Sequence, residues 1–240
     1  MNNSVTNTAR LLGAGLRALL VLTLVTGVIY PLVITGIAQG LFPGQANGSE
    51  IRSDGRVVGS SLIGQSYDLP LKKGQEAPEP DLKWFQGRPA HGLGTNTLNT
   101  RYRLLLSGAT NLAADNPELV RQVEAAKAAV IKENSVPGHP VRASEIPADA
   151  VTSSGSGLDP DISPQYAALQ IRRVAERNGL PVAEVRRLVE EHTEGRTLGF
   201  MGEPRVNVLE LNIALKELVP GGDGPGRGRK AGLSGAVSRA

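Results

Sequence analysis

One apolar stretch near the N-terminus constrains this chain more than any other feature. Residues 18–38, ALLVLTLVTGVIYPLVITGIA, hold 21 positions without a charged side chain. An α-helix rises about 1.5 Å per residue, so this stretch spans roughly 30 Å, the thickness of the hydrocarbon core of a bilayer. Helices of water-soluble domains rarely stay apolar on every side over that length. The sequence therefore predicts a transmembrane helix that anchors the rest of the chain at a membrane surface.

The residues that flank the stretch predict its orientation. Arg10 and Arg17 precede it, whereas the first charged residue after it is Glu50. The positive-inside rule then places the N-terminus in the cytoplasm and the remaining chain outside. A cleaved signal peptide is the alternative, although its apolar region normally covers only about 7–15 residues.

Four residues within the stretch suggest contact with another helix. Pro31 kinks the helix or frees a backbone carbonyl, which needs a partner in lipid. Gly27 and Gly36 permit close approach of a second helix, and Tyr30 lies beside the proline. We therefore expect these four residues to pack against a partner helix. The alternative is that glycine and proline are simply common in spanning helices.

The residues after the anchor predict one α+β domain. Helix-start signals and apolar residues at helical spacing predict three helices, which begin at Asn116-Pro117, at Ser163-Pro164 and at Pro181. Short apolar runs predict strands within residues 56–65, 146–152 and 206–218. The predicted order is a cytoplasmic N-terminus (1–17), the anchor (18–38), an extracytoplasmic α+β domain (39–219) and a disordered Gly-rich tail (220–240).

Composition and missing motifs exclude several classes of function. Aromatic residues make up only 3% of the chain and are not interleaved with a basic patch, so we expect no nucleic-acid partner. The chain has no cysteine and no HExxH motif, so we expect no zinc site built by the protein. It also lacks the GxxxxGK[ST] phosphate loop.

Two groups of residues still admit a chemical interpretation. Ser156, His192 and Asp159 could form a hydrolase triad, although SSGSG around the serine does not match the GxSxG turn of such enzymes. Asp159 and Asp161 could hold a calcium ion, because carboxylate oxygens suit that ion. The alternative, which we favour, is that Asp161 and Ser163 cap the helix that follows them.

Six segments of the chain carry a resemblance to a known family. They are YPLVITGIAQGLFPGQANGS at 30–49, GSSLIGQ at 59–65, WFQGRPA at 84–90, SGATNLAADNP at 107–117, SSGSGLDPDISP at 153–164 and HTEGRTLGFMGEPRVNVLELNIAL at 192–215. In this order they resemble the C subunit of the Kdp-type potassium-transporting ATPase, the KdpC family. The family commonly has histidine where this chain has Asp161.

The resemblance implies a non-catalytic subunit of a high-affinity, ATP-driven potassium uptake complex in the cell membrane. Its partners would be a channel-like potassium-binding subunit, a P-type ATPase subunit, a small accessory subunit and membrane lipid. The family's C subunit is described as an assembly factor and catalytic chaperone that raises the ATP affinity of the pump subunit. We expect no tightly bound cofactor, and ATP only through the pump subunit. Because ATP is cytoplasmic and we place the domain outside, the effect on ATP would pass through the anchor.

The sequence also nominates residues for docking on a partner, in two turns rich in glycine and charge. They are Gly155, Ser156, Gly157, Leu158, Asp159, Glu194, Arg196, Glu203, Arg205 and Asn207. The segment 106–110, LSGAT, distantly resembles a nucleotide-binding signature, but a Gly/Ser turn before a helix explains it equally well. Two other functions stay open, a membrane-anchored extracytoplasmic hydrolase and an isolated binding module.

Overall fold

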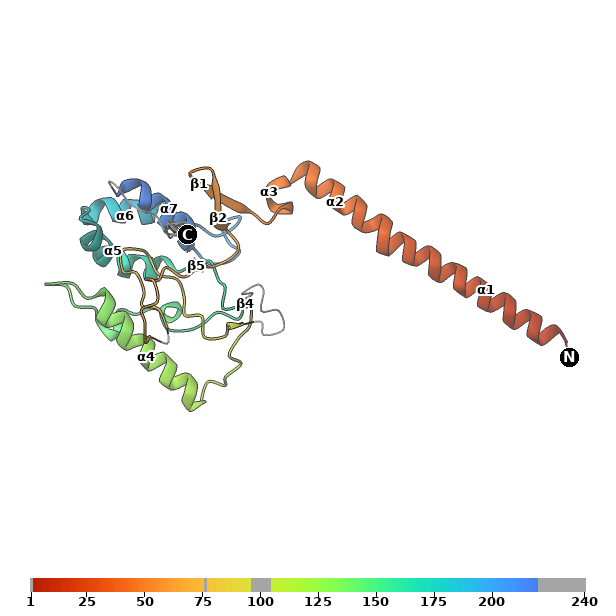
Figure 1. The fold of residues 1–240 in the computed structure, drawn as a ribbon, viewed down its shortest axis with the longest axis horizontal. Coiled ribbons are helices and arrows are strands. Elements are labelled where there is room, and N and C mark those ends of the chain that lie inside the picture. The colour runs from red at the N-terminus through yellow and green to blue at the C-terminus, as the bar shows by residue number, and fades with distance from the viewer. Residues whose placement is uncertain (1, 76, 96–104, 220–240) are drawn as a thin grey trace, which may run out of the picture. The chain divides into compact units, whose positions relative to one another are not determined.

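The N-terminal unit, Met1–Glu50, is built around one uninterrupted run of helix (Figure 1). A computed structural model of the chain describes residues 2–75, 77–95 and 105–219. In this unit α1 (Asn2–Leu24) leads through the π-helical turn η1 (Val25–Ile29) into α2 (Tyr30–Leu41), and the short α3 (Pro43–Ala46) follows. The helical segment Ser4–Leu41 is long and apolar enough to span a membrane, and its most apolar part is not buried within the chain. The narrower bounds expected for the anchor, 18–38, stay a prediction.

The π-helical turn lies immediately before Pro31. There the N–H of Tyr30 bonds the carbonyl oxygen of Val25, which lies five residues back instead of the usual four. Proline has no N–H to donate and its ring crowds the carbonyl four residues earlier. The wider turn accommodates the proline, and the helix continues past it.

The second unit, Ile51–Ala240, contains short strands and four longer helices among its described residues. From the unit boundary onward the elements are β1 (Glu50–Ser53), β2 (Arg56–Ser60), β3 (Gly94–Thr95), β4 (Leu105–Leu106), α4 (Pro117–Asn134), the 3₁₀ turns η2 (Ala143–Glu145) and η3 (Ala148–Ala150), β5 (Asp161–Ile162), α5 (Pro164–Asn178), α6 (Val182–Glu191), β6 (Thr193–Glu194), β7 (Arg205–Asn207) and α7 (Val208–Leu218). β1 pairs with β2 and β3 with β4, whereas β5, β7 and β6 form an antiparallel sheet with β7 in the centre. The α+β class is confirmed. The tail at 220–240 lies outside the described residues.

Local side-chain caps explain why the predicted helices begin where the sequence indicates. The Asn116 side chain accepts a hydrogen bond from the N–H of Glu118 at 2.8 Å, and the Ser163 hydroxyl accepts one from the N–H of Tyr166 at 3.0 Å. α5 ends at Gly179, whose φ of 65° lies in the left-handed region that glycine adopts readily. The third predicted helix begins directly after its predicted proline.

One predicted strand is shorter than expected and another is absent. The apolar run 206–218 stays extended only as far as Asn207, and α7 begins at the next residue. The Asn207 side chain accepts a hydrogen bond from the N–H of Glu210 at 3.2 Å and so caps that helix. Residues 146–152 contain the turn η3 and no strand, since their alanines and Asp149 have low strand propensity.

The core of this domain lies among α5, α6, α7 and the irregular segment 84–86. α5 packs against α4 and α6, and α6 packs against α7. Phe85, Val174 and Leu211 have no exposed surface. The irregular segment therefore enters the core without the hydrogen bonds of a strand, and its backbone groups need other partners.

Two side-chain amides supply these partners, and we call this arrangement the amide clamp. Asn212 of α7 accepts from the N–H of Phe85 at 2.9 Å and donates to its carbonyl oxygen at 2.9 Å. Gln170 of α5 bonds the backbone of Gln86 in the same way. Its side chain accepts from the N–H of Gln86 at 2.7 Å and donates to the carbonyl oxygen of Gln86 at 3.0 Å. The amide clamp thus takes the place of a β ladder around a buried loop.

Arg173 of α5 supports the amide clamp with further hydrogen bonds to the same irregular segment and to Gln170. Its side chain is 2% exposed. It donates to the oxygen of Trp84 at 2.9 Å and to that of Leu82. It also donates to Asn134 Oδ1 at 2.9 Å and to Gln170 Oε1 at 2.6 Å. Burial lowers the pKa of Arg173 to about 10, so the group stays cationic at neutral pH and spreads its charge over oxygen atoms.

Replacing Asn212 by alanine tests the amide clamp. The variant leaves the buried N–H and carbonyl of Phe85 without partners, so we expect it to lower the free energy of unfolding by about 2–4 kcal/mol. The measurement is urea unfolding of the full chain in detergent, followed by the fluorescence of Trp84, the one tryptophan of the chain. Lys127→Ala on the exposed face of α4 is the control and should change stability by less than about 0.5 kcal/mol. A change that small in Asn212→Ala would contradict the clamp.

Candidate functional site

Segments that lie far apart in the sequence meet around the loop of residues 155–161. The N–H of Gly64 donates to the carbonyl oxygen of Leu158 at 2.8 Å, and the N–H of Val208 donates to that of Pro160 at 3.0 Å. A Cβ atom at Gly64 would lie 2.4 Å from the backbone oxygen of the next loop residue, so only glycine permits this approach. The segments that contact the loop are 59–65, 84–90, 107–117 and 192–215.

An ion pair between Arg88 and Asp159 ties the core to this loop. Arg88 Nη1 lies 2.8 Å from Asp159 Oδ2, and both side chains are largely buried. The same guanidinium donates to the carbonyl oxygens of Thr152 at 3.4 Å and Ser153 at 3.5 Å. The other oxygen of Asp159 accepts from the N–H of Asp161 at 3.1 Å. The carboxylate nominated for docking is therefore engaged inside the chain.

A second cluster of charges links the three strands of the central sheet. Arg205 of β7 contacts Asp161 of β5 at 3.2 Å and Glu194 of β6 at 2.6 Å. Asn207 donates to Asp161 Oδ1 at 3.3 Å and to the carbonyl oxygen of Ser61 at 2.9 Å. Arg205 therefore holds the three strands together, and Asn207 links this sheet to the segment 59–65.

Burial raises the pKa of Asp161 above its ordinary value. The nearby Asp159 and Glu194 also raise this pKa, whereas Arg205 and a hydrogen bond from Asn207 lower it by less in total. A carboxyl at this position is thus easier to protonate in the folded chain than in the unfolded chain.

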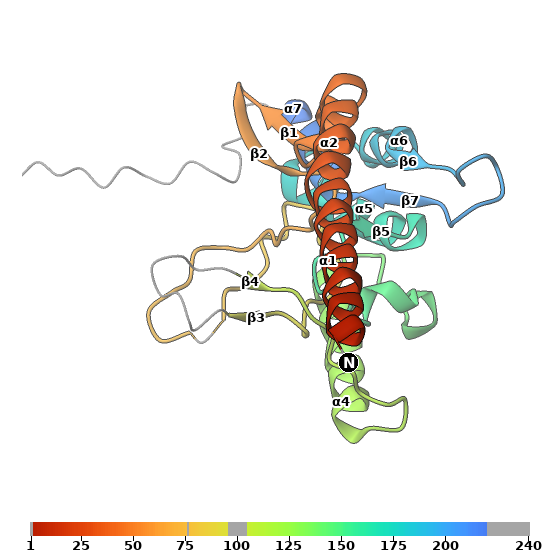
Figure 2. The ribbon, with the colours of Figure 1, turned by 90° about the vertical axis from the view of Figure 1, so that its right-hand side faces the viewer.

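β6 and β7 form a hairpin that reaches out from the sheet (Figure 2). Near its middle, Arg196 Nη2 lies 2.7 Å from Glu203 Oε2 across the two arms. Both side chains are exposed, so this pair contributes only about 0–1 kcal/mol to stability. The docking roles of Glu194, Arg196, Glu203, Arg205 and Asn207 stay predictions, but the structure brings all five into one braced hairpin.

Ser156, His192 and Asp159 are not assembled as a triad in the described part of the chain. The Ser156 hydroxyl accepts from the N–H of Leu158 at 3.1 Å. His192 Nδ1 lies 2.9 Å from the carbonyl oxygen of Leu188, and Asp159 pairs with Arg88. Each member therefore has a partner of its own.

One carboxylate of the 155–161 loop, Asp161, acts differently from our expectation. Ser163 caps α5 as predicted, but Asp161 does not, because it lies in β5 and pairs with Arg205. Asp149 supports the cap instead, accepting from the N–H of Ser163 at 2.7 Å and from its hydroxyl at 2.9 Å. Among residues 2–75, 77–95 and 105–219, no three His, Cys, Asp or Glu side chains are placed to hold a metal ion.

In the segment 106–110, hydrogen-bond donors that could bind a phosphate are bonded to the chain itself. The hydroxyl of Ser107 and the N–H of Gly108 both donate to the carbonyl oxygen of Ser156, at 2.9 and 3.1 Å. These bonds join the segment to the 155–161 loop, which favours the interpretation of LSGAT as a structural turn.

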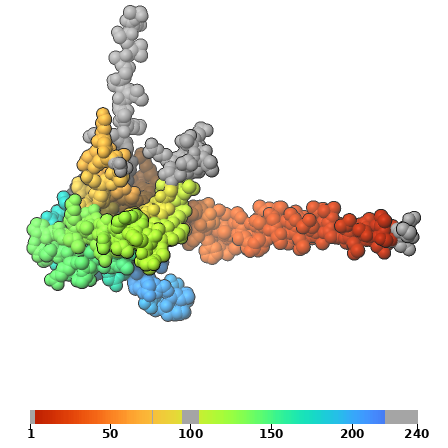
Figure 3. All heavy atoms as spheres, turned by 90° about the horizontal axis from the view of Figure 1, so that it is seen from below, coloured from red at the N-terminus to blue at the C-terminus, as the bar shows by residue number. Residues whose placement is uncertain are grey.

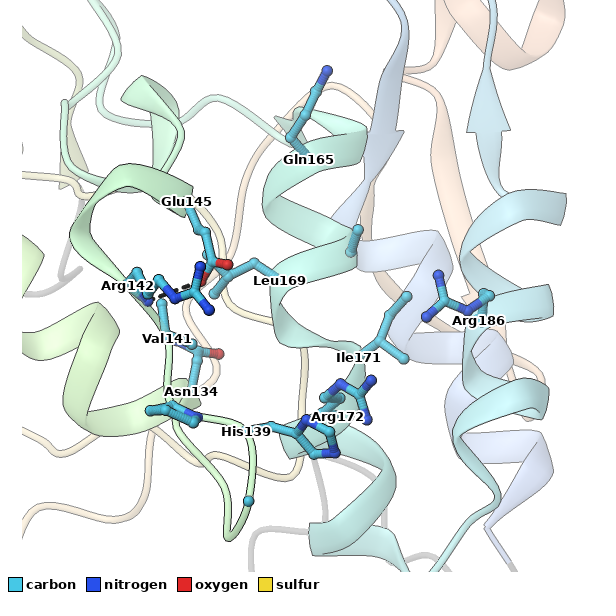
Figure 4. Close-up of a pocket in the computed structure, with 13 residues that line it drawn as sticks. Asn134, His139, Val141, Arg142, Glu145, Gln165, Leu169, Ile171, Arg172 and Arg186 are labelled. Carbon is cyan, nitrogen blue, oxygen red and sulfur yellow. Dashed lines mark hydrogen bonds between the residues drawn. The ribbon is translucent and has the colours of Figure 1, made fainter.

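A recess of about 510 Å³ opens elsewhere on the domain, between α5 and residues 138–145 (Figure 4). Arg142, Arg172 and Arg186 line it. None of the residues nominated for docking does, so we do not place the functional site there.

The sequence missed Arg88 and Ser61 as parts of the site. Both lie within segments that carry the family resemblance, and that was the signal available. In the N-terminal unit, a methyl group at Gly27 or Gly36 would meet no other atom within 4 Å, apart from chain neighbours and the backbone of the helix itself. Packing of another helix against these glycines, Tyr30 and Pro31 stays a prediction.

Comparison with known proteins places the chain in a family. A family model described as "KdpC: K+-transporting ATPase, c chain" matches residues 12–217. The potassium-transporting ATPase KdpC subunit of Streptomyces coelicolor is 75% identical over 224 residues, which is 93% of this chain and all of that protein. The protein of the same name from Caldanaerobacter subterraneus is 48% identical, covering 82% of this chain and 90% of its own length.

The raised pKa of Asp161 predicts a pH dependence. Between the ordinary pKa and the raised one, the folded chain binds more protons than the unfolded chain, so stability from this group falls as pH rises through that window. Asp161→Asn should remove this fall. The measurement is the free energy of unfolding of the full chain at several pH values between about 4 and 7. Asp115→Asn, on the exposed surface, is the control, and identical pH slopes in the two variants would contradict the assignment.

Proposed function

Since the chain belongs to the KdpC family of K+-transporting ATPase c chains, we propose that it serves a potassium uptake complex as a non-catalytic docking subunit. It joins the channel-like potassium-binding subunit, the P-type ATPase subunit and the small accessory subunit. In the assembled complex it raises the affinity of the pump subunit for ATP.

The observation that carries this proposal is how the charged residues around the 155–161 loop are used. Arg88, Asp159, Asp161 and Arg205 all bond to one another or to backbone groups of their own chain. A catalytic acid, base or nucleophile needs a free position beside its substrate. Groups engaged in this way instead hold a surface in one shape, which is what docking on a partner requires.

The proposal places the domain outside the cell membrane and the helix Ser4–Leu41 across it. Arg10 and Arg17 near the start of this helix support a cytoplasmic N-terminus through the positive-inside rule. The chain then reaches cytoplasmic ATP only by coupling. It must contact its neighbours differently in two states of the pump, through the outer domain, the anchor helix or both.

Removing the chain from the complex tests the proposed function. We compare purified complexes with and without this chain, together with potassium uptake by cells that lack it. We expect poor assembly, loss of high-affinity uptake, and an ATP concentration for half-maximal hydrolysis that rises about fivefold or more. Normal uptake with an unchanged ATP dependence would contradict the proposal.

Arg196 separates docking from folding. Because its ion pair with Glu203 is exposed, Arg196→Ala should lower the free energy of unfolding by less than about 1 kcal/mol while reducing the yield of purified complex. Exchanging the two charges, with Arg196→Glu and Glu203→Arg together, keeps the brace and should restore the yield. Equal losses of stability and yield in Arg196→Ala would mean that the residue is only structural.

A further inference from the structure

The β6–β7 hairpin ends in an apolar tip that its own domain does not cover. We call residues 198–201 the hairpin tip. In it Leu198 is 77% exposed, Phe200 69% and Met201 45%. The blue lobe that stands out from the domain in Figure 3 belongs to this part of the chain. A run of exposed aromatic, leucine and methionine side chains is typical of the centre of a protein interface.

The backbone of the hairpin tip is ordered by its own hydrogen bonds. The N–H of Thr197 donates to the oxygen of Met201 at 2.9 Å, and the N–H of Met201 donates back at 3.0 Å. Leu198 has a φ of 54°, in the left-handed region where residues other than glycine and asparagine are strained. The domain therefore holds a leucine where glycine or asparagine would relax the backbone, and it leaves the leucine side chain exposed. Strain held at an exposed position points to a use outside the chain.

The stalk of the hairpin argues for a protein occupant and against lipid. Its two arginines, Arg196 and Arg205, are each paired with a glutamate across the arms. Residues 193–206 thus carry two positive and two negative charges and no unpaired cation. A loop that inserts into a membrane normally has free basic residues beside its apolar tip to meet lipid phosphates. A neutral stalk with an apolar end matches an uncharged recess on a protein.

We propose that the hairpin tip inserts into an apolar recess on the extracytoplasmic face of another protein subunit of the same complex. This inference rests on the proposed function. In it the stalk pairs fix the direction of the hairpin, and Leu198 and Phe200 make the contact. The partner's recess is lined by aliphatic or aromatic side chains, and it does not need acidic residues, because the hairpin offers no free cation.

Two polar variants of the tip test the contact without disturbing the fold. Leu198→Asn suits the left-handed backbone, so the variant should unfold at the same urea concentration as the wild-type chain or a higher one. Leu198→Asn and Phe200→Ser should each lower retention of this chain by the other subunits about tenfold in detergent. Leu71→Asn, at a loop leucine that is 58% exposed, is the matched control and should keep full retention. Full retention in both tip variants would overturn the inference.

A photo-crosslinking side chain at position 200 identifies the occupant in the whole complex in its membrane. We expect a crosslink to one of the other subunits, located by mass spectrometry to a segment of apolar residues. Crosslinks to lipid alone, or none to a subunit, would overturn the inference. The proposed function fails separately: if cells lacking the chain keep high-affinity uptake, the subunit role is wrong. If they lose uptake but the tip variants assemble fully, only the tip contact is wrong.

Discussion

The α+β domain depends on the amide clamp that Asn212 and Gln170 place around the buried segment 84–86. A loop cannot enter a core unless its backbone groups are bonded, and here helix side chains supply those bonds. The clamp fixes the chain that leads to Arg88, whose ion pair with Asp159 then holds the 155–161 loop. That loop in turn receives backbone hydrogen bonds from Gly64 after β2, from Gly108 after β4 and from Val208 at the start of α7. A few long-range polar contacts therefore connect the core to the candidate docking surface.

On the candidate docking surface, charged and apolar side chains have different roles. Charged side chains are paired within the chain and hold strands and loops together, whereas the apolar side chains of the hairpin tip remain exposed. Exposed ion pairs contribute little energy but define direction, and apolar contacts contribute most of the energy at an interface. The proposed docking role needs this combination, since a coupling effect requires contacts that differ between two states of the partner.

Signals that act over one or two turns of chain were predictable from the sequence. Helix caps depend only on nearby residues, as at Asn116, Ser163 and the left-handed Gly179. The starts of α4 and α5 and the end of α5 could therefore be predicted. α7 was mistaken for a strand because its apolar residues fit both periods. Leu209, Leu211, Ile213 and Leu215 alternate as in a strand, whereas Val208, Leu211, Leu215 and Leu218 recur at helical spacing. The pairing of Asp161 with Arg205 and the role of Asp149 were not predictable, because they join residues that only the folded chain brings together. The family resemblance identified the segments of the site, but their convergence on the 155–161 loop is a property of the tertiary structure.

The side of the membrane on which the domain lies tests this account most directly. Lys72 and Lys73 lie in an exposed loop of the domain and offer trypsin a cleavage site. Sealed membrane vesicles of both orientations, containing the whole complex, can be treated with trypsin from outside. We predict cleavage of the domain in vesicles that keep the cell's orientation and protection in inverted ones. The reverse pattern would put the domain beside cytoplasmic ATP and contradict a mechanism that works by docking outside the membrane.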